Sequence, residues 1–259
     1  MNNTLHKIKS VPDFDNNIYY LYDENDHKLT IPRSVAIILD GNGRYAKKHN
    51  IERAKGHEAG CKNLEVILEE AVKIDVKFLT VYAFSTENWK RSTLEINSLF
   101  DLFFMYLNKI RDKAMKNNVK VQFIGDVKKF PPNITNECNL LSDLTKDNSG
   151  LIFSIAFNYG SRDEILRAVK RIYCKNYNID KLTIEDIADN LDTYNIEDPD
   201  LLIRTSGEYR LSNFLLWQLA YTELYFTDTL WPEFDVNEFY NAIYSYNLRE
   251  RRFGGRSNS

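Results

Sequence analysis

The chain has 259 residues, of which 43% are hydrophobic and 27% charged, and this composition is typical of a globular protein with a sizeable core. A net charge of −3 excludes the broad basic field that nucleic-acid binding needs, so an anion site has to be a local cluster of Arg and Lys. The three cysteines form no CxxC pair and no apolar run reaches about 18 residues, which argues against a disulfide framework, a zinc site and a membrane span, and favours the reducing cytoplasm.

The N-terminal segment, residues 1–31, is polar and weakly patterned. We expect it to form an extension that is packed on the surface or partly disordered. The main body is expected over residues 32–256, where short apolar runs alternate with helical patterns. The predicted strands are 35–39, 78–84, 119–124, 151–157, 201–204 and 223–226, and the main predicted helices are 58–74, 94–116 and 162–173.

The order of these elements indicates an α/β fold, with a single domain built on a mostly parallel central sheet that is flanked by helices. Nearly continuous apolar strands are typical of strands that are buried on both faces. In such folds ligands bind beyond the carboxyl ends of the strands. The polar residues that follow each strand are therefore the candidates for a functional site.

The first predicted strand is followed by Asp40-Gly41-Asn42-Gly43-Arg44. Two glycines let backbone N–H groups approach an anion closely, and the next residues can open a helix whose N-terminus favours phosphate. A carboxylate beside a phosphate is repulsive unless a cation lies between them, so Asp40 suggests Mg²⁺. The alternative is a tight turn between strand and helix in which Asp40 caps the helix.

A second polar cluster follows the strand at 78–84 and contains Ser85, Asn88 and Arg91. The two smaller side chains can hydrogen-bond a ligand, and Arg91 can reach a phosphate. The alternative is an ordinary capped turn before the next helix. Both interpretations stay open at the level of the sequence.

A third cluster begins at the end of the strand at 201–204 and contains Arg204, Arg210 and Ser212. Guanidinium groups bind phosphates through paired hydrogen bonds, so this cluster is a second candidate anion site. Glu223 begins the last predicted strand, which makes it a candidate metal ligand or arginine partner. The basic tail that follows, residues 249–256, is either functional or a solvated terminus.

Three motifs in this order resemble the cis-prenyltransferase family, that is, the undecaprenyl and dehydrodolichyl diphosphate synthases. They read Asp-Gly-Asn-Gly-Arg, Phe-Ser-Thr-Glu-Asn-Trp-Lys-Arg and Arg-Thr-Ser-Gly-Glu-Tyr-Arg-Leu-Ser-Asn-Phe-Leu-Leu-Trp-Gln. The closing Arg-Arg-Phe-Gly-Gly extends the resemblance, which covers about residues 32 to 256. It implies that the extension 1–31 precedes one catalytic domain.

The resemblance implies a role for each matching residue. Asp40 would coordinate Mg²⁺ and be central to catalysis, and Glu223 would help to hold the metal. Ser85 and Asn88 match positions near the reacting centre. The other substrate-binding positions are Gly41, Asn42, Gly43, Arg44, Tyr45, Arg53, His57, Thr86, Glu87, Trp89 and Arg91 for the allylic side, Arg204, Arg210 and Ser212 for isopentenyl diphosphate, and Arg252 and Gly254 for an Arg-x-Gly signal that reaches into the partner's site of a homodimer.

The implied activity is the Mg²⁺-dependent condensation of isopentenyl diphosphate with an allylic diphosphate, expected to be farnesyl diphosphate. The product would be a medium- or long-chain Z-polyprenyl diphosphate, with a peripheral membrane contact for its release. The growing chain needs an apolar tunnel, and the predicted helix at 94–116 is apolar almost all round, more than one core-facing stripe requires. The alternative for this helix is a buried core element.

The chain departs from the family pattern at a few positions. Tyr45 replaces a Trp, Ser92 a Pro, Ser206 a Gly and Tyr209 a His, while the charged groups of the mechanism are kept. A non-catalytic subunit of a heteromeric prenyltransferase is the second hypothesis, although such subunits lose the residues matching Asp40 and the arginines. A third, an unrelated phosphate-binding α/β protein, lacks support because neither a Walker A sequence nor a Gly-x-Gly-x-x-Gly fingerprint occurs.

Overall fold

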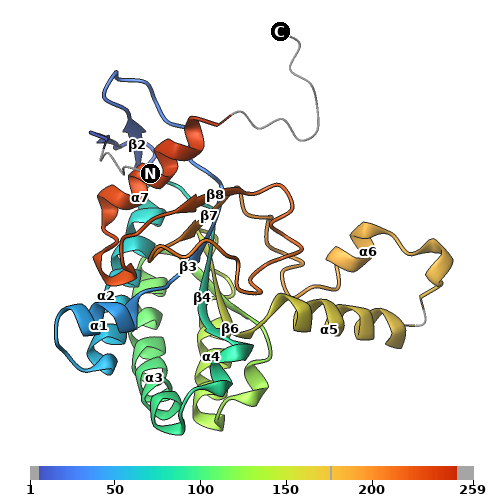
Figure 1. The fold of residues 1–259 in the computed structure, drawn as a ribbon. Helices are drawn as coiled ribbons and strands as arrows, with labels where there is room; N and C mark the ends of the chain where they lie inside the picture. The colour runs from blue at the N-terminus through green and yellow to red at the C-terminus, as the bar shows by residue number, and fades with distance from the viewer. Residues whose placement is uncertain (1–5, 176, 250–259) are drawn as a thin grey trace. The chain divides into compact units, whose positions relative to one another are not determined.

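The computed structural model describes residues 6–175 and 177–249, which fall into two compact units. Unit 1 contains the residues up to 77, residues 199–209 and the residues from 219 onwards; unit 2 contains residues 78–198 and 210–218. Each unit combines parallel strands with helices (Figure 1).

Unit 1 is built on the parallel strands β3 (Ser34–Ile38), β7 (Leu201–Arg204) and β8 (Glu223–Phe226). β3 pairs with β7, and β7 pairs with β8, so that Ile38 lies opposite Arg204 and Arg204 lies opposite Phe226. The first two strands are buried along their whole length, as their nearly continuous apolar sequences require. The helices of this unit are α1 (Asn42–Lys48), α2 (Arg53–Lys73) and α7 (Val236–Asn247), with the 3₁₀ turn η4 (Trp231–Glu233).

The N-terminal extension forms an antiparallel hairpin of β1 (Lys9–Asp13) and β2 (Ile18–Tyr22). It lies beside α7 (Figure 1), where the backbone N–H of His6 donates to Asn241 Oδ1 at 3.1 Å. The backbone N–H and C=O of Thr30 both bond to the Asn247 side chain, at 2.7 and 2.9 Å. The described part of the extension is therefore packed on α7 within unit 1.

Unit 2 is built on β4 (Phe78–Ser85), β6 (Ile152–Tyr159) and β5 (Lys120–Ile124), with β6 pairing in parallel with both of the others. Aromatic rings fill its core, including the stacked pair Phe130 and Phe157 at 4.3 Å. The helices are α3 (Thr93–Lys116), α4 (Pro132–Thr145), α5 (Ser161–Cys174) and α6 (Ile184–Ala188), and the 3₁₀ turns are η1 (Thr86–Lys90), η2 (Val127–Lys129) and η3 (Ile179–Lys181).

The sequence-based elements agree closely with these bounds. The strands predicted at 201–204 and 223–226 coincide with β7 and β8, and the helix predicted at 94–116 begins one residue earlier. The helix predicted at 58–74 begins at Arg53, because the glycines of its first turns hide the helical pattern. The α/β class, with parallel strands flanked by helices, is confirmed.

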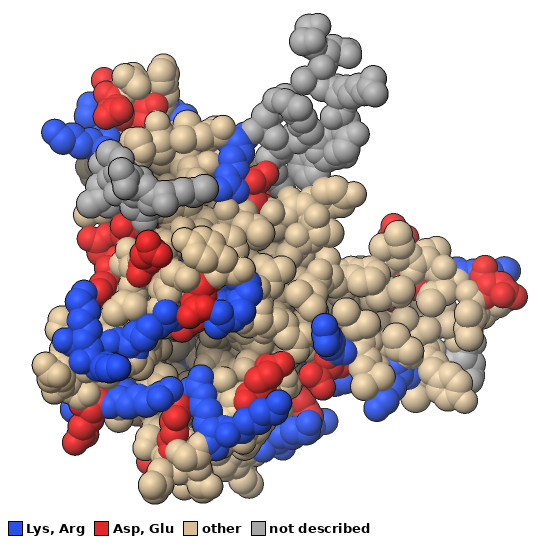
Figure 2. Space-filling model, viewed as in Figure 1, with Lys and Arg blue, Asp and Glu red and all other residues tan. Residues whose placement is uncertain are grey.

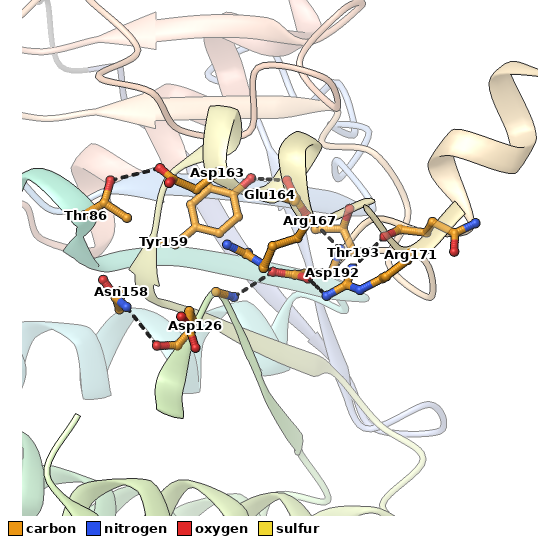
Figure 3. A network of polar contacts seen from close by, with 12 residues as sticks. Thr86, Asp126, Asn158, Tyr159, Asp163, Glu164, Arg167, Arg171, Asp192 and Thr193 are labelled. Carbon is orange, nitrogen blue, oxygen red and sulfur yellow. Dashed lines mark hydrogen bonds and ion pairs between the residues drawn. The ribbon is translucent and has the colours of Figure 1, made fainter. Parts of the chain in front are cut away.

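A buried polar network holds unit 2 together (Figure 3). The Tyr159 hydroxyl donates to Glu164 Oε2 at 2.5 Å, and the backbone N–H of Asp192 donates to Glu164 Oε1 at 2.9 Å. Asp192 in turn pairs with Arg167 and, at 2.7 Å, with Arg171. Burial raises the pKa of Glu164 above its ordinary value. For Asp192, burial alone would raise the pKa, but the hydrogen bonds and charges of the two arginines outweigh it and lower the pKa.

The surface carries charges of both signs. Figure 2 shows Lys and Arg side chains interleaved with Asp and Glu rather than one continuous basic field, as the net charge of −3 predicts. Among the helices that the structure describes, none is long and apolar enough to cross a membrane.

Candidate active site

Asp40 lies just beyond the end of β3, where its carboxylate meets two arginines of unit 1. Oδ2 accepts a hydrogen bond from Arg204 Nη2 at 3.0 Å, and Oδ1 lies 3.3 Å from Arg44 Nη2. The N-cap of α1 is Gly41, and no side chain caps this helix. The sequence alternative in which Asp40 caps α1 is therefore wrong, and its carboxylate is available to charged partners.

The backbone of Asp40 is fixed by Thr205. The Asp40 N–H donates to Thr205 Oγ1 at 3.1 Å, and this hydroxyl donates to the Asp40 carbonyl at 2.7 Å. The N–H of Trp231 donates to the same carbonyl at 3.0 Å. Sequence reasoning gave Thr205 no role, although it stands next to Arg204 in the third motif.

The two arginines differ in accessibility. Arg204 is 2% exposed, whereas the Arg44 side chain is 46% exposed and sits at the surface of the site. Arg44 Nη1 donates to the Ser206 carbonyl at 2.7 Å and lies 3.1 Å from Glu208 Oε1. Because Arg44 has solvent access, it can turn towards a phosphate, while Arg204 orients Asp40 from within the protein. Glu208, a partner of Arg44, is a second residue that sequence reasoning missed.

The turn at Ser206 and Gly207 approaches Gly41 closely. Gly41 has a φ of +115°, and a Cβ on it would lie 2.9 Å from Ser206 Oγ and 3.0 Å from the Trp231 nitrogen. Ser206 also has a positive φ, of 82°, and its buried Oγ has no hydrogen-bond partner in the described part of the chain. Glycine at position 41 thus permits both the backbone conformation and the close approach.

The start of α2 packs on α1 through glycines. A Cβ on Gly56 would lie 2.3 Å from the Asn42 carbonyl oxygen, and one on Gly60 would lie 2.2 Å from Asn42 Oδ1. Arg53 places its guanidinium over Gly43, whose added Cβ would lie 3.5 Å from it. His57 follows Arg53 by one helical turn, so both side chains belong to the same face of α2. Tyr45 stacks on His49 with ring centroids 4.3 Å apart.

The second predicted cluster lies in unit 2 and forms a capped turn. Asn88 Oδ1 accepts a hydrogen bond from the backbone N–H of Ser85 at 3.0 Å. Trp89 donates to Asn158 Oδ1 at 2.7 Å, and Arg91 pairs with Glu95 at 2.9 Å. The side-chain amide oxygen of Asn88 is therefore already hydrogen-bonded within the protein.

Thr86 and Glu87 of the same turn have partners in unit 2 as well. The Thr86 hydroxyl donates to Asp163 Oδ2 at 3.5 Å (Figure 3). Glu87 Oε1 accepts from the side chain of Asn213 at 3.1 Å. The turn is thus connected to two other segments of this unit.

Arg210 and Ser212 also belong to unit 2, and both are exposed. Ser212 has a positive φ of 50°, and its carbonyl accepts from the Tyr82 hydroxyl at 3.3 Å. Both side chains are open to solvent, and their role in substrate binding stays a prediction.

Glu223, the second predicted metal ligand, lies at the opposite end of the paired strands from Asp40. It begins β8 opposite Leu201, three residues before the end where Phe226 lies opposite Arg204. At roughly 3.3 Å per residue this separates it from that end by about 10 Å. Its carboxylate accepts from Arg249 Nη1 at 2.8 Å. Arg252 and Gly254 lie outside the described residues.

The donor set fits Mg²⁺ in one specific way. Among the described residues, no group of three or more His, Cys, Asp and Glu side chains gathers to hold a metal alone. Asp40 offers one carboxylate, 29% exposed, next to the close approach at Gly41. Mg²⁺ commonly binds one or two carboxylates together with substrate phosphates and waters, so a single carboxylate is sufficient.

Helix α3, expected to line a tunnel, is apolar on more than one side. Leu99, Tyr106, Leu107 and Ile110 are buried, whereas Phe104 is 41% exposed. Phe100, Leu102 and Phe103 are half-buried. One side of α3 is therefore a core face, and the tunnel itself stays a prediction.

These features define an α/β protein in which oppositely charged side chains meet beyond the carboxyl ends of β3 and β7. The undecaprenyl diphosphate synthase family model matches residues 38–254, and the chain belongs to this family. It is an enzyme, a transferase of prenyl groups. The match includes residues of both units.

Curated relatives carry the name isoprenyl transferase. The one from Fusobacterium nucleatum is 51% identical over 229 residues, covering 88% of this chain and 98% of the relative. The one from Aquifex aeolicus is 46% identical and covers 87% of this chain and 97% of the relative.

Solved structures agree with the family. Lavandulyl diphosphate synthase from Lavandula x intermedia, in complex with dimethylallyl diphosphate, gives a TM-score of 0.84 at 33% identity and covers 86% of this chain and 98% of its own. A probable undecaprenyl diphosphate synthase from Campylobacter jejuni gives 0.74 at 35% identity and covers 87% of this chain and all of its own.

Proposed function

We propose that this enzyme condenses isopentenyl diphosphate with an allylic diphosphate, farnesyl diphosphate in the first instance, and makes a medium- or long-chain Z-polyprenyl diphosphate. The observation that carries the proposal is the meeting of Asp40, Arg44 and Arg204 beyond the ends of β3 and β7. A buried arginine, an exposed arginine and a half-exposed carboxylate form a site for a diphosphate with its cation.

The allylic diphosphate binds at the start of α1 in this proposal. Backbone N–H groups from Gly41 to Gly43 and the guanidinium groups of Arg44 and Arg53 take up its negative charge. Asp40 would hold Mg²⁺, which when bound neutralises the charge that develops on the departing diphosphate. At 4 Å and an effective dielectric of about 20, one charge pair contributes about 4 kcal/mol, so several contacts supply much of a barrier reduction of roughly 8 kcal/mol or more.

Isopentenyl diphosphate binds through Arg210 and Ser212, which are exposed. Arg204, which the resemblance assigns to isopentenyl diphosphate, is buried against Asp40, so in this proposal it holds the Asp40 carboxylate in place. The double bond of isopentenyl diphosphate attacks C1 of the allylic substrate, the bond from C1 to the diphosphate breaks, and loss of a proton forms the new cis double bond.

The proton acceptor is a diphosphate oxygen, Ser85 or Asn88. Neither side chain is a strong base at neutral pH. The engagement of Asn88 Oδ1 by the Ser85 N–H favours the diphosphate oxygen over Asn88.

The functional unit in this proposal is a cytoplasmic homodimer that touches the membrane to release its product. Apolar side chains exposed on α5 support an interface with a second copy; they are Leu166, Val169 and Tyr173. The tail with Arg252 and Gly254 would complete the partner's site.

One assay tests the proposal. Purified protein is incubated with farnesyl diphosphate, labelled isopentenyl diphosphate and Mg²⁺, with and without EDTA. We expect labelled Z-polyprenyl diphosphates that disappear with EDTA, and the product length measures the depth of the tunnel. No product from the protein alone, with product only after a second subunit is added, would establish a non-catalytic subunit instead.

A further inference from the structure

The loop from Arg210 to Leu215 in unit 2 has an unusual backbone. Ser212, Asn213 and Leu215 all have positive φ values, of 50°, 61° and 45°. The left-handed region costs a residue other than glycine roughly 1 kcal/mol or more, so such a loop persists only where its surroundings fix it. The question is which contacts hold it.

Asn213 makes hydrogen bonds to two other segments of unit 2. Its backbone carbonyl accepts from the N–H of Ser161 at 2.7 Å, and its Oδ1 accepts from the N–H of Arg162 at 3.0 Å. Its Nδ2 donates to Glu87 Oε1 at 3.1 Å. One side chain therefore joins the start of α5 to the turn η1.

The carboxylate of Glu87 is suited to this contact. Burial acts to raise its pKa, but hydrogen bonds from its own backbone N–H and from Asn213, Ser85 and Thr86 outweigh burial and hold the pKa below its ordinary value. Glu87 is thus an ionised acceptor at neutral pH. A hydrogen bond to a charged group is stronger than one between neutral groups.

Gly160 keeps space open for the contact. A Cβ at this position would lie 2.7 Å from Asn213 Nδ2, 2.7 Å from Thr86 Oγ1 and 3.0 Å from Asp163 Oδ2. Thr86 and Asp163 face one another beside it (Figure 3). The backbone of residue 160 therefore packs directly under the polar groups that surround Asn213.

We propose that Asn213 is a positioning residue whose hydrogen bond to Glu87 of η1 holds the loop that bears Arg210 and Ser212. We call this contact between Asn213 and Glu87 the clasp. It rests on the proposed function, because it fixes the two side chains that would bind isopentenyl diphosphate relative to the turn at the reacting centre. Asn213 touches no substrate itself. Phe214, the next residue, is fully buried and stacks on Tyr82 at 4.5 Å, so the loop stays anchored when the clasp is broken.

An exchange of donor and acceptor tests the clasp. Asn213→Asp keeps the size of the side chain and the acceptor for the Arg162 N–H, but places a carboxylate against Glu87. We expect the KM for isopentenyl diphosphate to rise about tenfold to a hundredfold, with a smaller change in the KM for farnesyl diphosphate. Adding Glu87→Gln to this variant restores a donor on the opposite side, so the double variant should recover most of the lost affinity.

A matched control exists at Asn118 in the same unit. This residue also has a positive φ, of 54°, and its side-chain amide bonds to the uncharged Ser149, at 3.0 and 3.1 Å. Asn118→Asp should leave both KM values within about twofold, since no charge repulsion arises.

The outcomes separate the clasp from the proposed function. Equal effects of Asn213→Asp and Asn118→Asp, or a double variant no better than Asn213→Asp, would overturn the clasp. If the wild-type protein made no product, the proposed function would fail instead. Amide hydrogen exchange over residues 210–215 would still decide the clasp, which requires faster exchange in Asn213→Asp and slower exchange again in the double variant.

Discussion

The guanidinium of Arg204, 2% exposed, donates to the carboxylate of Asp40 at 3.0 Å, across the paired ends of β7 and β3. A buried arginine that loses its partner is costly, with about 3–5 kcal/mol typical of broken buried pairs. Asp40 therefore has a structural task as well as a chemical one. Replacement of Asp40 by Ala would remove both roles at once. Asn removes the charge and keeps an acceptor for Arg204, so it separates the two roles.

Asp40→Asn should lower turnover about 10²- to 10³-fold while the protein stays folded. The amide oxygen can still accept from Arg204, but the charge that attracts a cation is gone. Label incorporation from isopentenyl diphosphate and the thermal midpoint are measured on the same preparation. Asp40→Ala should lose stability as well as activity. Turnover of Asp40→Asn close to that of the wild type would remove Asp40 from the metal site.

Ser206→Gly should make the protein more stable. Ser206 holds a φ of 82°, which glycine adopts freely, and its buried hydroxyl has no partner in the described part of the chain. A gain of about 1 kcal/mol corresponds to a rise of roughly 2–4 °C in Tm for a protein of this size. Ser206→Ala keeps the backbone strain and serves as the control in calorimetry. A lower Tm for the glycine variant than for the alanine variant would contradict the inference that the backbone at Ser206 is strained.

Gly43→Ala and Gly56→Ala should have opposite effects on stability. A Cβ on Gly56 would lie 2.3 Å from the Asn42 carbonyl oxygen, so this variant has to displace α1 and lose stability, by about 1–3 kcal/mol. A Cβ on Gly43 meets Arg53 only at an ordinary 3.5 Å, so the fold should be retained and the helix favoured. Urea unfolding should separate the two variants, whereas the activity of both should fall. Equal stability of the two would argue against the tight contact between α1 and α2.

Glu164 and Asp192, neighbours in the buried network, should respond to pH with opposite signs. Burial raises the folded-state pKa of Glu164, so its contribution to stability is complete below its unfolded pKa of about 4.3 and is lost as pH rises through the folded value. Glu164→Gln removes this titration. The free energy of unfolding of the variant, relative to wild type, should therefore increase between pH 5 and pH 8.

Asp192→Asn provides the contrast in the same urea experiment. Its arginine partners lower the folded-state pKa against the effect of burial, so its contribution is present above an unfolded pKa of about 3.9 and is lost as pH falls through the folded value. This variant should be less stable than wild type at both pH 5 and pH 8. A Glu164→Gln variant whose stability relative to wild type did not increase between pH 5 and pH 8, or an Asp192→Asn variant as stable as wild type, would contradict the assignment of the two carboxylates.

Much of the fold could be predicted from the sequence because its strands are short apolar runs with sharp ends. β7 and β8 are of this kind, and both were predicted with the correct bounds. The hairpin of β1 and β2 was not predicted, because a two-stranded hairpin is marginal alone and depends on contacts with α7, more than 200 residues later. A pattern in neighbouring residues cannot indicate a contact with a segment so far away in the sequence.

The sequence predicted the individual residues of the site but not the contacts between them. Asp40 and Arg204 were assigned to two different substrate sites, whereas the structure joins them in one ion pair. The register between β3 and β7 produces that pairing, and register cannot be read from either strand separately. Glu208 and Asn213 stood inside a quoted motif without a role, because their side-chain partners Arg44 and Glu87 lie far away in the chain.

The hydrogen bonds between the N-terminal extension and α7 have a consequence for folding during protein synthesis. His6 and Thr30 leave the ribosome more than 200 residues before their partners Asn241 and Asn247. β3 likewise has to wait for β7. Unit 2 is mostly one continuous stretch, residues 78–198, so its strands can pair while translation continues. The half of the enzyme that bears Asp40 can therefore be completed only after unit 2 has been synthesised, because β7 follows residues 78–198 in the chain.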